Sequence, residues 1–216
     1  IMRPPSRLGL APTVYDDLFS GVDLTPTLLD LVGVDIPDSV DGDSHASALV
    51  GTEDAAVRTE VFTEKTYHDA FDPIRAVRTK QFSYIENYAA RPALLLPLDI
   101  ADSLSARSLD QQEVQRDRSR VELYDLRSDP HERNNVADDP SYARIRDDLA
   151  RALAEWRQRT HDELPDEAAG TATAEAFMDA FHAKAAQVEA EEEALPSRRP
   201  LGARRELAGD ITSGER

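Results

Sequence analysis

The stretch VELYDLRSDPHERNNVADDP, residues 121–140, constrains the fold more than any other part of the chain. Val121 and Leu123 lie two residues apart between more polar side chains, which predicts one strand with a single apolar face. An Asp-Pro corner and a doubled Asn then predict an irregular reversal, since Asn tolerates left-handed backbone conformations. Asp139 and Pro140 are typical of a helix N-cap and first turn. A strand and a helix therefore follow each other closely, which indicates a mixed fold.

The helix that begins near Pro140 has one apolar stripe, and the chain before it contains strand-like runs. The stripe consists of Tyr142, Ile145, Leu149, Ala152, Leu153 and Trp156. Short alternating runs occupy residues 59–64, 74–79 and 82–87, and the tight connection between the last two predicts an antiparallel hairpin. We therefore predict an α+β fold, in which a small antiparallel sheet is packed by one long helix.

An earlier helix is predicted within residues 24–33. Thr25 is a candidate N-cap, Pro26 suits the first helical position, and Gly33 suits the left-handed end of the helix. Its apolar side chains leave little polar surface; they are Leu28, Leu29, Leu31 and Val32. We expect this helix to pack against another part of the protein.

The formal net charge is -17, and Lys occurs at only three positions while Arg supplies most of the positive charge. This bias resembles that of a salt-adapted proteome. An acidic surface repels phosphates and anionic lipids, so we expect neither a nucleic acid nor a membrane as partner. At about 1 M salt the Debye length is about 3 Å, so an anionic small ligand is not excluded.

The sequence assigns no compartment. It has no Cys, which excludes disulfides and thiolate chemistry within these residues. No apolar run reaches the roughly 20 residues of a membrane span, and the first residues lack the apolar core of a signal peptide. The expectation is a cytoplasmic location if the intact protein also lacks a signal. The first residue is Ile, which suggests a piece of a longer protein.

Few residues in the sequence are candidates for a catalytic, ligand-binding or metal-binding role. DGDSH, with Asp41, Asp43 and His45, resembles part of a calcium loop but lacks its closing Glu, and we favour a surface turn. His131 is expected to be solvated. His68, beside carboxylates in EKTYHDAFD, is equally compatible with a solvated and a ligand-binding role. No nucleophile elbow, phosphate-binding glycine loop or H-E-x-x-H pair is present. We therefore assign no catalytic residue and no metal ligand.

Four motifs occur in an order that resembles the carboxyl-terminal part of type I sulfatases, over about residues 20–163. They are LTPTLLDLVG, RAVRTKQFSYIEN, ELYDLRSDPHERNNVADDP and LARALAEWRQRTHD. Within that family, VFTEKTYHDAFDPIRAVRT and WRQRTHD are most similar to the heparan N-sulfatase, or sulfamidase, branch. The resemblance implies the carboxyl-terminal subdomain of the alkaline phosphatase-like sulfatase fold, preceded by the last helix of the α/β domain.

The same resemblance implies chemistry that these residues do not provide. Family members use a formylglycine, made from Cys or Ser in C/S-x-P-x-R, and a calcium ion. RPPSR, residues 3–7, mimics this signature, but Arg3 stands where Cys or Ser is required, so we treat the match as coincidence. We expect formylglycine and calcium in the intact family member and neither bound by this chain. As a carboxyl-terminal fragment, it is expected to be inactive alone, whereas the intact protein would hydrolyse a sulfuric ester or a sulfamate.

The resemblance also divides the chain and suggests contacts. Residues 1–52 would end the catalytic domain, residues 53–164 would form the carboxyl-terminal subdomain, and residues 165–216 an acidic helical or disordered tail. His68 stands where the sulfamidase-like branch also has His. His68 and Arg75 are the candidate substrate-binding residues, for a sulfated small molecule or sulfated sugar.

For Arg78, pairing with a carboxylate on the sheet is the favoured role. The exposed helix at residues 24–33 is expected to promote self-association below molar salt.

Two other functions remain open. One alternative is a free-standing acidic interaction module, whose tail helix docks a partner through a face containing Phe177, Phe181, Ala185 and Val188. The other alternative is part of a related phosphoesterase.

Overall fold

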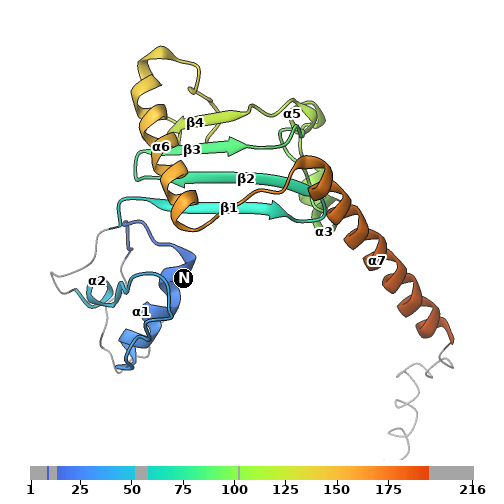
Figure 1. Cartoon of the computed structure of the whole chain (residues 1–216), viewed down its shortest axis with the longest axis horizontal. Helices are drawn as coiled ribbons and strands as arrows, with labels where there is room; N and C mark the ends of the chain where they lie inside the picture. Colours follow the sequence, from blue (N-terminus) through green and yellow to red (C-terminus); the bar gives the residue numbers. More distant parts are fainter. Residues whose placement is uncertain (1–8, 10–13, 52–57, 102, 195–216) are drawn as a thin grey trace, which may run out of the picture.

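The computed structural model describes residues 9, 14–51, 58–101 and 103–194, without the side chains at 185 and 188–194 (Figure 1). Its centre is a four-stranded antiparallel sheet with the strand order β1-β2-β3-β4. The strands are β1 (Val61–Tyr67), β2 (Phe71–Arg78), β3 (Phe82–Asn87) and β4 (Val121–Asp125). The predicted α+β class is confirmed.

Two tight hairpins connect the first three strands. Between β2 and β3, the hydroxyl oxygen of Thr79 accepts hydrogen bonds from the amides of Gln81 (3.2 Å) and Phe82 (2.9 Å), which closes the predicted connection. The β1–β2 hairpin was not predicted: β1 continues three residues beyond the expected run 59–64 and turns at His68. The strands β1 and β2 therefore meet in a hairpin turn at residues 68–70.

The core lies between the sheet and helix α6 (Ala143–Arg159), which crosses one face of the sheet (Figure 1). Val77 pairs with Tyr84 and Tyr84 with Leu123, so three neighbouring strands present one apolar patch. Leu149 and Leu153 of α6 are buried against this patch. Burial of each such side chain contributes about 1.5–3 kcal/mol. The predicted apolar stripe of the helix is confirmed.

The start of α6 follows the predicted cap. Asp139 accepts a hydrogen bond from the amide of Ser141 at 2.8 Å, and Pro140 begins a 3-10 turn (Pro140–Tyr142) that leads into the helix. The doubled Asn differs from expectation, because among the described non-glycine residues only Glu132 and His161 have a positive φ. Asn135 instead uses its side chain, whose oxygen accepts a hydrogen bond from the amide of Leu123 at the outer edge of β4 (3.0 Å).

The N-terminal part contains a 3-10 turn (Gly21–Asp23) and the helices α1 (Leu24–Leu31) and α2 (Ala46–Val50). The predicted cap at Thr25 is wrong: Thr25 lies inside α1, and Ser20 with Asp23 forms a capping box one turn earlier. The Asp23 carboxylate accepts a hydrogen bond from the amide of Ser20 at 2.8 Å. The first unpaired backbone amides are therefore capped before the chain reaches Thr25. Gly33 ends the helix in a left-handed conformation, as predicted.

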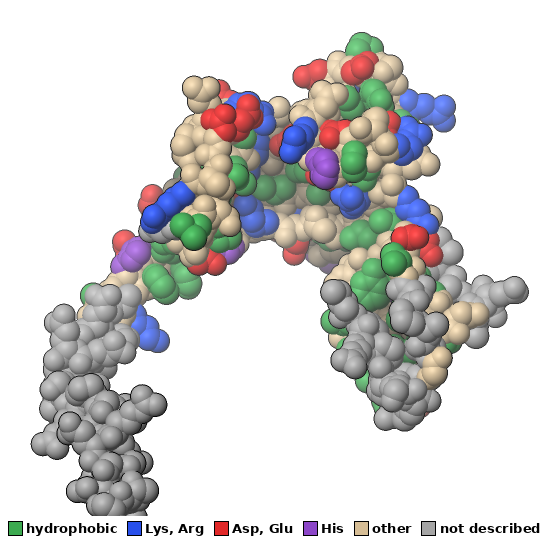
Figure 2. All heavy atoms as spheres, turned by 180° about the vertical axis from the view of Figure 1, so that it is seen from behind, with side chains coloured by type: hydrophobic (Ala, Val, Ile, Leu, Met, Phe, Trp, Pro, Cys, Tyr) green, Lys and Arg blue, Asp and Glu red, His purple; other side chains and the backbone are tan. Residues whose placement is uncertain are grey.

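Large apolar side chains lie exposed on α1 and the loops beside it. We call them the α1 patch: Val22, Leu24, Leu28, Val32, Val34 and Ile36. Figure 2 shows hydrophobic side chains at the surface of the lobe that contains α1 and α2. Within the described residues, therefore, the predicted apolar helix is only partly covered.

Three short helices and one long helix gather at the end of the sheet where β1 turns into β2 (Figure 1). The short ones are α3 (Leu98–Ala101), α4 (Leu104–Arg107) and α5 (Gln111–Gln115). Helix α7 (Glu167–Ala194) contacts β2 through its first turns and then projects away from the sheet. In the described part of the chain, no helix combines the length and the apolar character that a membrane span requires.

Candidate functional site

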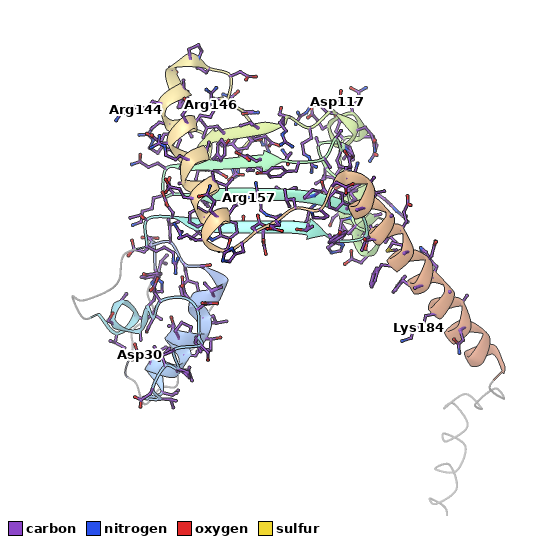
Figure 3. All side chains as sticks on the ribbon, viewed as in Figure 1. Asp30, Asp117, Arg144, Arg146, Arg157 and Lys184 are labelled. Carbon is purple, nitrogen blue, oxygen red and sulfur yellow. The ribbon has the colours of Figure 1, made fainter. Side chains whose placement is uncertain are left out.

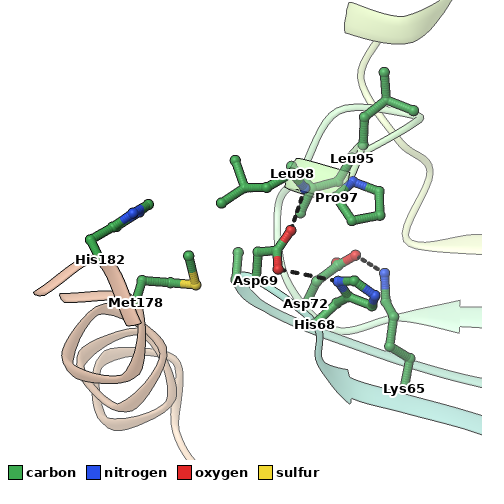
Figure 4. Close-up of a pocket in the computed structure, with 11 residues that line it drawn as sticks. Lys65, His68, Asp69, Asp72, Leu95, Pro97, Leu98, Met178 and His182 are labelled. Carbon is green, nitrogen blue, oxygen red and sulfur yellow. Dashed lines mark hydrogen bonds and ion pairs between the residues drawn. The ribbon is translucent and has the colours of Figure 1, made fainter. Parts of the chain in front are cut away.

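A cavity of about 460 Å³ lies where the β1–β2 hairpin, the loop before α3 and helix α7 meet (Figure 4). The hairpin supplies its polar lining, whereas the loop and α7 supply mostly apolar side chains. The lining residues are Lys65, His68, Asp69, Ala70, Asp72, Leu95, Leu96, Pro97, Leu98, Met178 and His182. We call this space the hairpin cavity.

The floor of the hairpin cavity is a buried ionic cluster around Asp72, whose side chain is 1% exposed. Lys65 Nζ lies 2.5 Å from one carboxylate oxygen, and Arg118 donates to both. Burial alone would raise the pKa of Asp72, but the hydrogen bonds from Arg118 and Lys65 outweigh it and lower the pKa below its ordinary value. Asp72 therefore stays ionised and holds Lys65 in place.

His68 stands at the rim of the hairpin cavity, at the turn of the hairpin. Its side chain is 57% exposed, and its Nδ1 lies 3.4 Å from an oxygen of Asp69. The other oxygen of Asp69 accepts a hydrogen bond from the amide of Leu98 at 2.5 Å, which connects the hairpin to the loop before α3. Among the described residues, no hydrogen bond engages Nε2 of His68, so this nitrogen is available to a ligand.

Arg75, the other predicted substrate-binding residue, lies on β2 with its side chain 2% exposed. Its Nε and one terminal nitrogen donate to the two oxygens of Asp162, at 2.7 and 2.6 Å. The remaining N–H groups donate to the carbonyls of Lys65 and Ile74 and the hydroxyl of Thr66. All five donors are thus used within the protein, and contact between Arg75 and a ligand stays a prediction.

Asp162 also forms an ion pair with a second arginine. Arg157 of α6, labelled in Figure 3, donates to Asp162 at 2.8 Å and to the hydroxyl of Tyr88 at 2.9 Å. The hydrogen bond from Arg75, against the effect of burial and with help from Arg157, lowers the pKa of Asp162. The two arginines join the end of α6 to the middle of the sheet.

The DGDSH motif differs from the expected surface turn. Asp41 and Asp43 are exposed, but His45 is fully buried. The physical reason is a set of polar partners that sequence spacing does not reveal. His45 Nε2 lies 3.3 Å from Asp23 and its Nδ1 lies 2.6 Å from the hydroxyl of Tyr15.

The same cluster fixes α1. The His45 amide donates to the Thr27 hydroxyl at 3.0 Å, and Arg58 donates to Asp23. Burial raises the pKa of Asp23, yet the backbone amides and Arg58 that donate to it lower the pKa overall. With His45 inaccessible and Asp23 paired with both His45 and Arg58, we interpret the cluster as structural.

Of the cavity residues, sequence reasoning proposed only His68, and the most distant of those that it missed are Met178 and His182 of α7. They follow Gly170 and Ala174 at intervals of four, so all four lie along one side of the helix. Gly170 and Ala174 are buried, and small residues four apart were the signal that could have indicated this face.

The predicted apolar face of the tail helix lies elsewhere on α7. Phe177 and Phe181 are 64% and 55% exposed, and the side chains of Ala185 and Val188 lie outside the described residues.

Two candidate residues from the sequence remain, His131 and Arg78. His131 is exposed, in agreement with a solvated role. Arg78 pairs with Glu132 at 2.6 Å on the surface, as favoured for it.

A calcium site does not fit the donors that the structure describes. Within the described residues, no three His, Asp or Glu side chains are close enough together to hold a metal ion. The chain has no Cys, and RPPSR at residues 3–7 lies outside the described part. We derive no step through a metal or a formylglycine on this chain.

Residues 1–100 match the family described as N-sulphoglucosamine sulphohydrolase, C-terminal. An ulvan-active sulfatase of Formosa agariphila is 31% identical over 182 residues, which cover 77% of this chain and 30% of that protein. Human N-sulphoglucosamine sulphohydrolase is 28% identical over 179 residues, 73% of this chain and 35% of the relative. Among solved structures, a 2-O GAG sulfatase is 27% identical, with a TM-score of 0.47 over 65% of this chain and 25% of that one.

The chain thus spans about a third of the length of the relatives it matches. In the sequence comparisons, the matching relatives include sulfatases from bacteria and from human, and the matched family is a carboxyl-terminal one. The chain belongs to the sulfatase family, and its residues 1–100 match the carboxyl-terminal domain of that family.

Proposed function

We propose that this chain forms one wall of the substrate pocket of a sulfatase that acts on sulfated sugars, and that His68 contacts the substrate. The proposal rests on one observation: His68 stands at the rim of the hairpin cavity with its Nε2 unengaged among the described residues, while its Nδ1 lies 3.4 Å from Asp69. With the proton on Nδ1, Nε2 accepts a hydrogen bond from a sugar hydroxyl; with both ring nitrogens protonated, Nε2 donates to a sulfate oxygen. The relatives named as sulfatases of ulvan and of N-sulphoglucosamine support sulfated sugars as the substrate class.

Under this proposal the chemistry of sulfate cleavage comes from the remainder of the sulfatase, where formylglycine and calcium would supply the nucleophile and charge stabilisation. This chain binds and orients the sugar. Arg75 would act from behind the site, because its fork fixes the Lys65 carbonyl and Thr66 just before the hairpin turn. Contact between Arg75 and a ligand would require the guanidinium to leave Asp162.

The boundaries proposed for the chain agree with this division of work. Residues 1–52 would form the end of the catalytic domain, residues 53–164 the carboxyl-terminal subdomain, and residues 165–216 the tail. The α1 patch supports the first boundary, since apolar side chains of this kind are normally covered.

Binding can be tested on the chain itself. We would titrate the 15N-labelled chain with glucosamine N-sulfate and follow amide chemical shifts. The expected result is a saturable shift confined to residues 68–70 and 95–98, absent with unsulfated glucosamine. His68→Ala should weaken binding about tenfold, as expected for loss of one hydrogen bond to a charged group. His131→Ala, an exposed histidine elsewhere, is the matched control. Wild-type shifts that are absent or unaffected by His68→Ala would overturn the proposal.

Hydrolysis gives a second test. With calcium and molar salt, this chain should release no more product from an aryl sulfate than a buffer blank. Turnover that depends on His68 would show that a complete catalytic site lies within these residues, and the proposed division of work would then be wrong.

A further inference from the structure

The hairpin cavity has two chemically different sides. The β1–β2 hairpin contributes charged and polar groups, among them His68 and Asp69. The opposite side is formed by a run of apolar residues, 95–98, together with Met178 of α7. A ligand that fills this space must combine a polar part with an apolar one.

Helix α7 is held over the cavity by a close contact rather than by chance proximity. Gly170 lies against the ring of Phe71, so that a Cβ at this position would be 2.4–2.6 Å from three ring carbons. A Cβ therefore cannot be accommodated there unless the helix or the Phe71 ring moves. Glu167 adds an ion pair with Arg91 at 3.4 Å, and Ala174 is 7% exposed.

This attachment determines where the next turns of α7 point. Met178 and His182 lie four and eight residues beyond Ala174, and they project toward the hairpin and the loop that ends at Leu98 (Figure 4). Met178 is partly buried although it lies between exposed neighbours. The two aromatic residues of this segment, Phe177 and Phe181, do not line the cavity.

We propose that Met178 and His182 make α7 a specificity-determining wall of the substrate pocket. Met178, with the apolar residues 95–98, contacts an apolar group attached to the sulfated sugar, and His182 donates a hydrogen bond to the ligand. This inference rests on the proposed function. Its substrate class is a sulfated sugar that carries an apolar aglycone or acyl substituent, since a thioether and leucine side chains favour such groups.

The test uses two ligands that differ only in the apolar group: the 4-methylumbelliferyl glycoside and the methyl glycoside of glucosamine N-sulfate. For the wild-type chain, the aromatic glycoside should bind about tenfold more tightly, as expected when roughly 50 Å² of apolar surface is buried. Met178→Ala should reduce this preference to about threefold or less. Phe177→Ala, the adjacent exposed residue, should keep it.

The role of His182 predicts a different pattern of affinities for the two glycosides. His182→Ala should weaken both glycosides by a similar factor of about three to ten, and His182→Gln should restore part of the loss because it retains a donor. Gly170→Val, which displaces α7, should reduce the aromatic preference while leaving binding of the methyl glycoside dependent on His68. Circular dichroism would verify that each variant is folded.

The outcomes separate the two proposals. If the wild-type chain binds neither glycoside, or if His68→Ala changes neither affinity, the proposed function fails. If binding depends on His68 but the aromatic preference survives in both Met178→Ala and Gly170→Val, the role of α7 is wrong and the proposed function stands.

Discussion

Arg75 and Asp162 form a bidentate ion pair, with N–O distances of 2.7 and 2.6 Å, that joins the middle of β2 to the residues just after α6. Both side chains are nearly buried, at 2% and 9% exposure. A planar guanidinium matches a carboxylate at two points, which fixes direction as well as distance. The pair therefore sets how α6 leaves the sheet, and through Lys65 and Thr66 it also supports the hairpin at the candidate site.

Removing one member of this pair should be costly. Asp162→Asn is expected to lower the free energy of unfolding by about 3 kcal/mol, because buried Arg75 would keep only the exposed Glu64, 3.6 Å away, as a counter-charge. Urea denaturation followed by the fluorescence of Trp156 measures this change. Asp148→Asn, at an exposed pair with Arg151, is the matched control and should change stability by less than about 0.5 kcal/mol. Equal effects of the two substitutions would contradict the assigned role.

The pH dependence of stability should reveal the buried carboxylates. The pKa of Asp72 is lowered from an ordinary value of 3.8, because hydrogen bonds from Arg118 and Lys65 outweigh the effect of burial. The unfolded chain therefore takes up the proton at higher pH than the folded chain does. The contribution of ionised Asp72 to the free energy of unfolding is fully present above pH 3.8. It is lost as the pH falls through the lower pKa that Asp72 has in the folded state.

The measurement is urea denaturation at a series of pH values. Asp72→Asn should be less stable near neutral pH and should lose less stability on acidification. Asp41→Asn, at an exposed position, should follow the wild-type curve. An Asp72→Asn curve parallel to the wild type throughout the acid range would show that this carboxylate does not contribute as stated.

Much of the fold was predictable because local patterns determine it. The alternation around Val77 and Leu123 gave the apolar face of the sheet, and the Asp139-Pro140 pair gave the start of α6. The end of β1 was missed, because its outer residues are polar on both faces and a partly exposed strand has no apolar alternation to detect.

The candidate site was only half predictable. His68 could be proposed from its neighbours and from the family resemblance, whereas Met178 and His182 lie more than 100 residues away and meet it only through the docking of α7. Phe177 and Phe181, which the interaction-module hypothesis assigns to the docking of a partner, lie exposed, whereas the small residues Gly170 and Ala174 are the buried ones on this helix. Close packing of a helix on an aromatic ring favours Gly and Ala, which hydropathy ranks low.

The α1 patch predicts the behaviour of the chain in solution. Exposed apolar side chains on one surface favour association, so the chain should sediment as species larger than a monomer in dilute buffer. Leu28→Gln combined with Val32→Gln should shift the distribution toward monomer. Leu104→Gln, an exposed leucine outside the patch, is the control. A monodisperse wild-type monomer in dilute buffer would contradict the prediction.

Gly170 provides the sharpest test of how α7 is attached. Gly170→Val should bring side-chain atoms into steric overlap with ring carbons of Phe71. Overpacking of this kind costs about 1–3 kcal/mol of stability. Because the buried residues described on α7, Gly170 and Ala174, lie in its first turns, the expected result is detachment of the helix rather than global unfolding. Hydrogen exchange should show loss of protection in residues 167–178, with β3 and β4 unchanged. Ala172→Val, on the exposed side of the same turn, controls for the lower helix propensity of Val. Equal protection of α7 in both variants would mean that the contact between Gly170 and Phe71 does not hold the helix, and the wall of the hairpin cavity would then need another explanation.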